Sequence, residues 1–230
     1  SLGMLVMDEN RNFNSSPEYI EQLRWLIRRD RNHPCVILWS VFNEEPMQGE
    51  EIGYEMVRRM SAEVKKLDTT RLVTAVMNGG LFSTINVSHA ADIVGFNYQP
   101  QNYDNFRRRN PDMCMTSSED VSCVMQRGQY VTDKNNNLLD SYDIQHPGWG
   151  TTHRKSWKAI NERPYLAGCF VWTGFDYKGE PTPFSWPTVN SNFGIMDLCG
   201  FPKTAYYIYQ AYWLQHPVLH IEPHWNWPTD

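Results

Sequence analysis

The segment that decides the fold is RNHPCVILWSVFNE, residues 31–44, in which an apolar run ends abruptly in Asn43-Glu44. The continuously apolar stretch predicts a strand over 36–40, buried on both faces as in a parallel sheet. Glu44 then emerges at the carboxyl edge of that sheet, the edge where the catalytic side chains of a barrel lie. A carboxylate is costly beside such a run unless it is paired or functional. We therefore interpret Glu44 as a proton donor; the alternative is a glutamate stabilised by a helix N-terminus.

Outward from this strand, short apolar runs alternate with amphipathic segments along the chain. Ser16-Pro17 starts one helix, and a second helix is predicted over 50–67, with glutamate early and Lys65 and Lys66 late. Further helices are expected around 103–109, 154–162 and 203–214. The predicted strands are 4–7, 36–40, 72–75, 93–96, 113–116 and 166–172.

This alternation predicts an α/β fold, a TIM (β/α)8-type barrel with about six of its eight strands present. The first strand begins at once, so we expect the barrel to be incomplete at its N-terminus and the chain to be cut from a longer protein. The catalytic barrel domain is assigned to residues 1–214. Residues 215–230, with a short strand expected at 218–220, would start a following β domain or form a C-terminal tail. The Asn-rich stretch 120–150 is too long for an ordinary connection and is interpreted as an active-site loop or a partly disordered segment.

Three more strand ends carry polar or aromatic side chains. Glu119 follows the strand at 113–116 and can face Glu44 across a sugar, although Ser-Ser-Glu-Asp also fits a helix cap. Asn97 and Tyr98 end the strand at 93–96, where a phenol could keep the Glu119 carboxylate ionised. Trp172 ends the last strand and could form the floor of a sugar site. The alternatives are a tyrosine bonded elsewhere and a core tryptophan.

Composition excludes some functions. A net charge of −5 argues against a nucleic-acid partner, and no apolar run is long enough to span a bilayer. Aromatic residues make up 13% of the chain, including nine Trp, which fits either a large core or a sugar-binding cleft. The five cysteines show no metal-binding spacing, and three of them, Cys35, Cys114 and Cys169, lie in or beside apolar runs, which favours reduced core thiols over metal ligands. A soluble protein is expected, whether cytoplasmic, periplasmic or secreted.

The segments RNHPCVILWSVFNE, DIVGFNY, TSSE, VWTGFDYKGEPTPFSWP and NFGIMDLCGFPK together resemble glycoside hydrolase family 2, in particular its bacterial β-galactosidases. The resemblance implies that Glu44 is the acid/base and Glu119 the nucleophile. It also implies that Asn43 contacts the sugar 2-hydroxyl and that Tyr98 and Trp172 flank the site. The remaining predicted substrate-binding residues are Asn97, Asp8 and Glu9.

Two departures from the family's sequence motifs bear on the expected metal and on the expected substrate. Magnesium-dependent members follow their Asp-Glu pair with a carboxylate and a histidine, whereas Asp8-Glu9 is followed by Asn10-Arg11-Asn12-Phe13-Asn14. No catalytic metal and no cofactor are therefore predicted. The family's β-glucuronidases use Asn-x-Lys to hold the substrate carboxylate, and residues 190–192 are Asn-Ser-Asn, with no lysine at that spacing. Lys203 is expected to form a salt bridge at the start of a helix.

The predicted function is a retaining exo-β-glycosidase that hydrolyses terminal β-galactosides by double displacement, with carbohydrate as its partner. Three alternatives stay open: another β-glycosidase specificity, a cellulase-like endo-glycosidase, and a non-catalytic fragment that binds sugar or self-associates. Self-association into a homo-oligomer would follow if missing strands leave an open sheet edge.

Overall fold

The computed structural model describes residues 4–221, which fold into two compact units. The first unit comprises the chain up to Glu119 together with Arg163–Cys169. The second comprises Asp120–Glu162 and the residues from Phe170 onward.

The main sheet has six strands in sequence order, β1-β2-β3-β4-β5-β6. They are β1 (Val6–Glu9), β2 (Val36–Asn43), β3 (Leu72–Met77), β4 (Ile93–Asn97), β5 (Cys114–Val121) and β6 (Leu166–Trp172). Strands β1 to β5 pair in parallel, each with the next along the chain. Six strands in this order confirm the prediction of an incomplete TIM-type barrel sheet.

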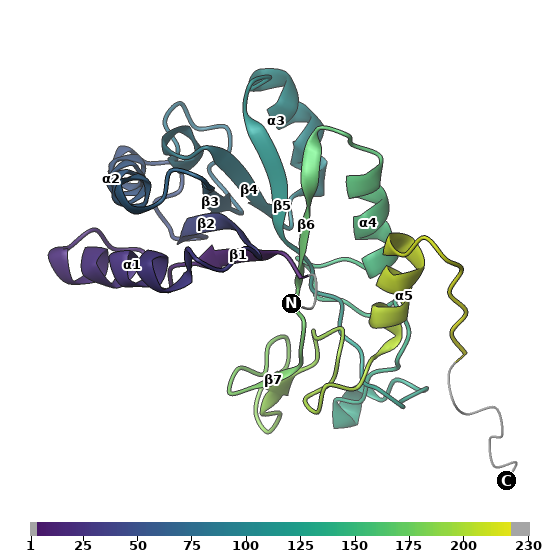
Figure 1. Cartoon of the computed structure of the whole chain (residues 1–230). Coiled ribbons are helices and arrows are strands. Elements are labelled where there is room, and N and C mark those ends of the chain that lie inside the picture. The colour runs from purple at the N-terminus through teal and green to yellow at the C-terminus, as the bar shows by residue number, and fades with distance from the viewer. Residues whose placement is uncertain (1–3, 222–230) are drawn as a thin grey trace, which may run out of the picture. The chain divides into compact units, whose positions relative to one another are not determined.

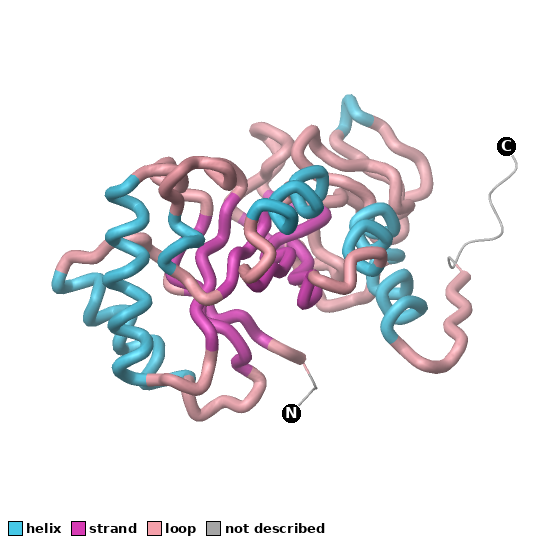
Figure 2. The backbone as a smooth tube through the Cα atoms, turned by 90° about the horizontal axis from the view of Figure 1, so that it is seen from above, coloured by secondary structure: helices cyan, strands magenta, loops and turns pink. Residues whose placement is uncertain are grey.

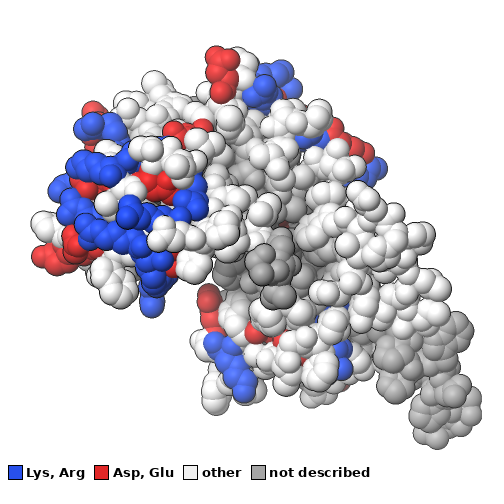
Figure 3. Space-filling model, viewed as in Figure 1, with Lys and Arg blue, Asp and Glu red and all other residues white. Residues whose placement is uncertain are grey.

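In the first unit, helices α1 (Pro17–Asp30) and α2 (Glu51–Leu67) connect the first three strands and pack beside them (Figures 1 and 2). Pro17 stands at the start of α1, and Ile20, Leu23 and Ile27 form the buried face of this amphipathic helix. Glu51 begins α2 and Lys65 and Lys66 end it, as the helix dipole favours. The outer surfaces of these helices are rich in both signs of charge (Figure 3), with ion pairs such as Arg24–Glu63 at 2.7 Å.

The core of the first unit is dense beneath these helices. Trp39 and Phe42 from β2 and Val64 from α2 are almost fully buried. The indole of Trp39 donates a hydrogen bond to Asp68 at 3.0 Å, so the polar atom of this large core residue is satisfied. The first unit also contains η1 (Val87–Ala90), η2 (Pro100–Asn102) and α3 (Tyr103–Arg109).

The second unit contains η3 (Lys134–Asn136), α4 (His153–Asn161), a short hairpin of β7 (Tyr177–Lys178) and β8 (Asn190–Ser191), and α5 (Thr204–Trp213). The extended segment after β5 places alternate side chains in two small cores. Val121, Cys123 and Met125 pack with Ala205, whereas Val124 packs with Leu139 and Phe193. The long 120–150 stretch is therefore anchored by its own buried side chains.

Two details differ from the sequence predictions. Strand β5 continues through Glu119 to Val121, so the helix-cap alternative for Ser-Ser-Glu-Asp is wrong. The short strand expected at 218–220 is absent from the described residues 215–221, and residues 222–230 lie outside the described part of the chain.

Candidate active site

Strands β2 and β4 end in the same way. Asn43 and Asn97 are the last strand residues, and Glu44 and Tyr98, which follow them, have positive φ angles of 55° and 52°. Each of these two residues donates its backbone N–H to the neighbouring strand, Glu44 to the Val76 carbonyl and Tyr98 to the Glu119 carbonyl, both at 3.1 Å. A left-handed conformation is unfavourable for residues with a side chain, and such strain is typical of functional sites.

The strand register also shifts at these two ends. The shifts lie between Ser40 and Asn43 in β2 and between Phe96 and Asn97 in β4. Irregularities of this kind redirect side chains beside active sites. Glu44 is also separated from the start of α2 at Glu51, so the alternative of a glutamate at a helix N-terminus is wrong.

The amide of Asn97 joins the two strand ends. Its Nδ2 donates to Glu44 Oε1 at 2.8 Å and to Asn43 Oδ1 at 3.1 Å. Its own Oδ1 accepts a hydrogen bond from the Ser118 hydroxyl at 2.9 Å. Asn97 is fully buried, and these bonds orient both the amide and the Glu44 carboxylate. The sequence analysis did not predict a role for Ser118. The pattern that could have indicated it is a serine immediately before a glutamate in a buried strand.

Tyr98 is the partner of Glu119. Its hydroxyl donates to Glu119 Oε1 at 2.6 Å, a short, charge-assisted hydrogen bond. Burial raises the pKa of Glu119 to about 7, and the charges of Glu44 and Glu9 add to that effect, while the Tyr98 hydrogen bond opposes it. The charge of Glu44 acts on the pKa of Glu119 because the two carboxylates lie at the same edge of the sheet.

Asp8 and Glu9 are neighbours in β1 but have different surroundings, as alternating strand side chains do. Glu9 accepts a hydrogen bond from the Ser40 hydroxyl at 2.8 Å, and its pKa is raised by burial and by the charge of Glu44. Asp8 instead interacts with Asp30 and Arg29 at the end of α1. Its pKa is raised to about 6 by burial and by the Asp30 carboxyl. The structure thus groups Glu9 with the two candidate catalytic glutamates and places Asp8 with the helix.

Trp172 belongs to the second unit. It packs against the cluster of Val124, Leu139 and Phe193 and meets Tyr177 edge-on, with ring centroids 6.0 Å apart. The indole is partly buried, so it takes part in this core, as the core alternative for Trp172 expects. Lys203, at the start of α5, forms an ion pair with Asp176 at 2.7 Å, which confirms the salt bridge predicted for it.

The described helices include none that is both long enough and apolar enough to cross a membrane. The described side chains that could together hold a metal ion, Cys123, Asp143 and His153, lie in the second unit.

The fold and the strand-end carboxylates define the class of α/β-barrel proteins whose sites lie at the carboxyl ends of the strands. A family model described as "Glycosyl hydrolases family 2, TIM barrel domain" matches residues 3–216. The chain belongs to this family.

Three of the similar proteins come from species of Bacteroides. A β-galactosidase of Bacteroides ovatus is 34% identical over 98% of this chain and 34% of its own length. A β-glucuronidase of Bacteroides fragilis is 29% identical over 87% of this chain and 30% of its own. A crystal structure of a glycosyl hydrolase family 2 member from Bacteroides cellulosilyticus has a TM-score of 0.71 at 28% identity, covering 94% of this chain and 27% of that one. This chain spans about a third of the length of the two curated relatives.

Proposed function

We propose that this protein hydrolyses β-glycosides with retention of configuration, with Glu119 as nucleophile and Glu44 as acid/base. One observation carries the proposal: two glutamates share one sheet edge, and each accepts a hydrogen bond from its own side-chain partner. Retaining enzymes need two carboxyl groups about 5–5.5 Å apart on either side of the scissile bond.

In the first step, the ionised Glu119 carboxylate attacks the anomeric carbon while Glu44 donates its proton to the departing glycosidic oxygen. The bond between the anomeric carbon and that oxygen breaks, and a covalent glycosyl-enzyme forms. In the second step, Glu44 takes a proton from water, whose oxygen attacks the anomeric carbon and releases Glu119. Tyr98 and Asn97 hold the two carboxylates in orientation throughout, and Asn43 is proposed to contact the sugar 2-hydroxyl.

The proposed substrate is a terminal β-galactoside. The name of the Bacteroides ovatus relative supports it, since that protein is a β-galactosidase and is 34% identical over 98% of this chain. The Asn190-Ser191-Asn192 segment supports it too, because it lacks the lysine that would hold the carboxylate of a uronic acid.

A second candidate substrate is a β-glucuronide. The Bacteroides fragilis relative favours it, because that β-glucuronidase is 29% identical over 87% of this chain. Aryl β-galactoside and aryl β-glucuronide, assayed side by side, separate the two candidates by their kcat/KM values. Binding of the sugar product without turnover of either substrate would instead support a non-catalytic sugar-binding role.

The assignment of Glu119 is tested by Glu119→Gln, which removes the negative charge and keeps the shape of the side chain. We expect kcat to fall by at least about three orders of magnitude, because no covalent intermediate can form. Glu45→Gln, in the residue next to the candidate acid/base, is the matched control and should keep activity near that of the unaltered protein. Near-normal hydrolysis by Glu119→Gln would contradict the mechanism.

A further inference from the structure

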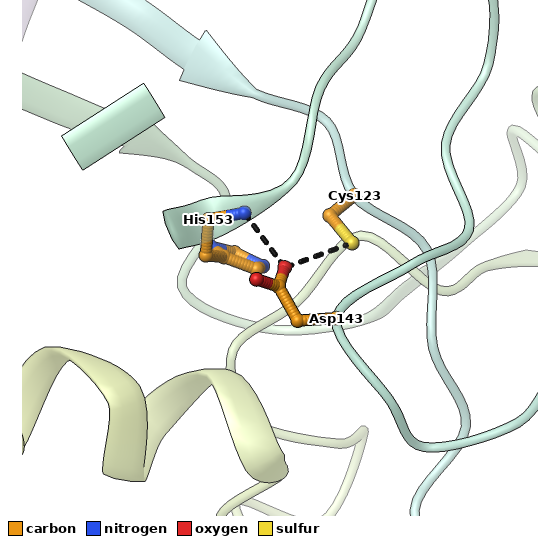
Figure 4. A group of neighbouring side chains, drawn as sticks. All are labelled: Cys123, Asp143 and His153. Atoms are coloured by element: carbon orange, nitrogen blue, oxygen red, sulfur yellow. Dashed lines mark hydrogen bonds between the residues drawn. The ribbon is translucent and has the colours of Figure 1, made fainter. Parts of the chain in front are cut away.

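Three potential metal ligands converge in the second unit. Cys123 follows β5, Asp143 lies in the long loop after it, and His153 is the first residue of α4. One ligand atom from each lies within 4.8 Å of the other two, and Figure 4 shows the three side chains turned toward one another. All three residues are buried, with exposed fractions of 1%, 3% and 0%.

The carboxylate of Asp143 is held firmly in place. Its Oδ1 accepts the backbone N–H of His153 at 2.7 Å, and its Oδ2 accepts the backbone N–H and the Nε of Arg154 at 3.1 and 3.0 Å. The Cys123 sulfur lies 3.5 Å from the same Oδ1 and 3.1 Å from the Gln145 carbonyl oxygen. Two of the three ligands are thus positioned by contacts that do not require a metal.

The imidazole of His153 has one nitrogen engaged and one free. Nδ1 lies 3.0 Å from the Tyr209 hydroxyl, while Nε2 is buried and lacks a hydrogen-bond partner among the described residues. A buried polar atom without a partner costs free energy, so it calls for an explanation. Burial lowers the pKa of His153 to about 4, so the ring is neutral at physiological pH and can carry a lone pair on Nε2. Ligating histidines commonly donate their other N–H to an oxygen, as Nδ1 can to Tyr209.

We propose that Cys123, Asp143 and His153 form a binding site for a zinc ion, with His153 binding through Nε2. In tetrahedral zinc sites, a thiolate sulfur and a carboxylate oxygen at their usual bond lengths lie about 3.6 Å apart. The 3.5 Å between Cys123 Sγ and Asp143 Oδ1 fits this geometry. A mixed sulfur, nitrogen and oxygen set suits zinc, and three protein ligands leave the fourth position for water.

The two anionic ligands suit a cation. One thiolate and one carboxylate match the charge of a divalent ion, and the Arg154 guanidinium, which lies 3.0 Å from Asp143 Oδ2, is 60% exposed, so water solvates its additional positive charge. The nearby lysine, Lys203, is already paired with Asp176 at 2.7 Å. In the metal-free protein, burial and the Asp143 carboxylate raise the pKa of the Cys123 thiol. Zinc binding therefore displaces the thiol proton to solvent, and the ion ties the long loop to the start of α4.

The experiment uses the 230-residue protein, stripped with a chelator and refolded with Co²⁺ or Zn²⁺. We expect one metal ion per chain by elemental analysis and, with Co²⁺, a thiolate-to-cobalt charge-transfer band in the near ultraviolet that Zn²⁺ abolishes. Cys123→Ser and His153→Gln should weaken binding by more than about 100-fold. Cys199→Ser, at an exposed cysteine in the same unit, is the matched control and should bind like the unaltered protein.

The unaltered protein's cobalt spectrum decides the question even if a variant misfolds, which circular dichroism would reveal. A refolded protein that holds less than a stoichiometric metal ion, or that binds Co²⁺ without the thiolate band, would overturn the proposal. A loss of the band in Cys199→Ser would overturn the assignment to Cys123. Glycosidase activity takes no part in the readout, so the result is independent of the proposed function.

Discussion

At the scale of single residues, the protonation of Glu119 depends on the balance between burial and the Tyr98 hydroxyl. Burial raises the pKa of Glu119 to about 7, and the hydrogen bond at 2.6 Å counteracts part of that rise. A nucleophile must be ionised, so the proposed mechanism ties activity to this balance. The free enzyme should lose kcat/KM as the pH falls below about 7.

Tyr98→Phe tests this balance. Loss of the hydroxyl removes an interaction that favours the ionised carboxylate, so the acidic limb of the kcat/KM profile should move up by roughly one pH unit. Activity should therefore fall more near pH 6 than near pH 8. Tyr165→Phe is the matched control, because it removes a tyrosine–carboxylate hydrogen bond to Asp104, elsewhere in the first unit. An unchanged limb in Tyr98→Phe would refute the role assigned to Tyr98.

The same pKa predicts a pH-dependent stability effect of Glu119→Gln. Since the pKa of Glu119 is raised in the folded protein from 4.5 to about 7, the wild-type protein loses stability as the pH rises through this interval. Glutamine does not titrate, so the variant's advantage should grow over the same interval, by on the order of 3 kcal/mol. Urea unfolding at several pH values measures it, and parallel stability curves for the two proteins would contradict the raised pKa.

At the scale of elements, the strand and helix pattern was largely predictable, while strand ends were not. The helix predicted over 50–67 is α2 at Glu51–Leu67, because its apolar face and its terminal charges agree. Strand β5 was predicted to end at 116 but continues to Val121. Ser117 and Ser118 look like loop residues, yet both are buried in the strand, and the Ser118 hydroxyl bonds to Asn97, a partner distant in sequence.

Gly95 in β4 provides a test of this packing. A methyl group there would lie 2.5 Å from Ser118 Oγ and 3.0 Å from Val76 Cγ2. Gly95→Ala should therefore cost roughly 1–3 kcal/mol in unfolding free energy and, by displacing Ser118 from Asn97, also lower kcat. Gly79→Ala is the matched control, since the nearest atom to its methyl group, Gln48 Nε2, would be 3.8 Å away. Equal stability of the two variants by thermal melting would show that β4 and β5 tolerate the added volume.

At the scale of the whole molecule, the six-stranded sheet was predictable from the alternation of apolar and amphipathic segments. The division into two compact units could not be predicted from this alternation, because it depends on which strand ends and loops pack together. The meeting of Cys123, Asp143 and His153 was equally hidden, since these residues lie 20 and 10 positions apart and follow no ligand spacing. For the active site, the strand-end position of Glu44 predicted its role as proton donor, and the role of Glu119 came largely from the family resemblance. The structure added Ser118 and Ser40 as hydrogen-bond partners.

The outer strand β1 bears on the predicted self-association. The two apolar residues that precede this strand are exposed, Met4 by 70% and Leu5 by 63%. An uncovered apolar edge favours pairing with another chain, and charged residues oppose it. Leu5→Lys should therefore shift the protein toward monomer in sedimentation velocity, whereas Leu219→Lys, at a residue that is 87% exposed, should not. A monomeric unaltered protein at all concentrations would contradict this prediction.

The pairing of Glu119 with Glu44 is tested most directly by trapping the covalent intermediate. A 2-deoxy-2-fluoro glycoside with a good leaving group slows the second step of a retaining mechanism, so the glycosyl-enzyme should accumulate. Peptide mapping by mass spectrometry should then find one added fluoroglycosyl group, on Glu119. A label on any other residue, or turnover of the ordinary substrate with inversion and no label, would contradict the account.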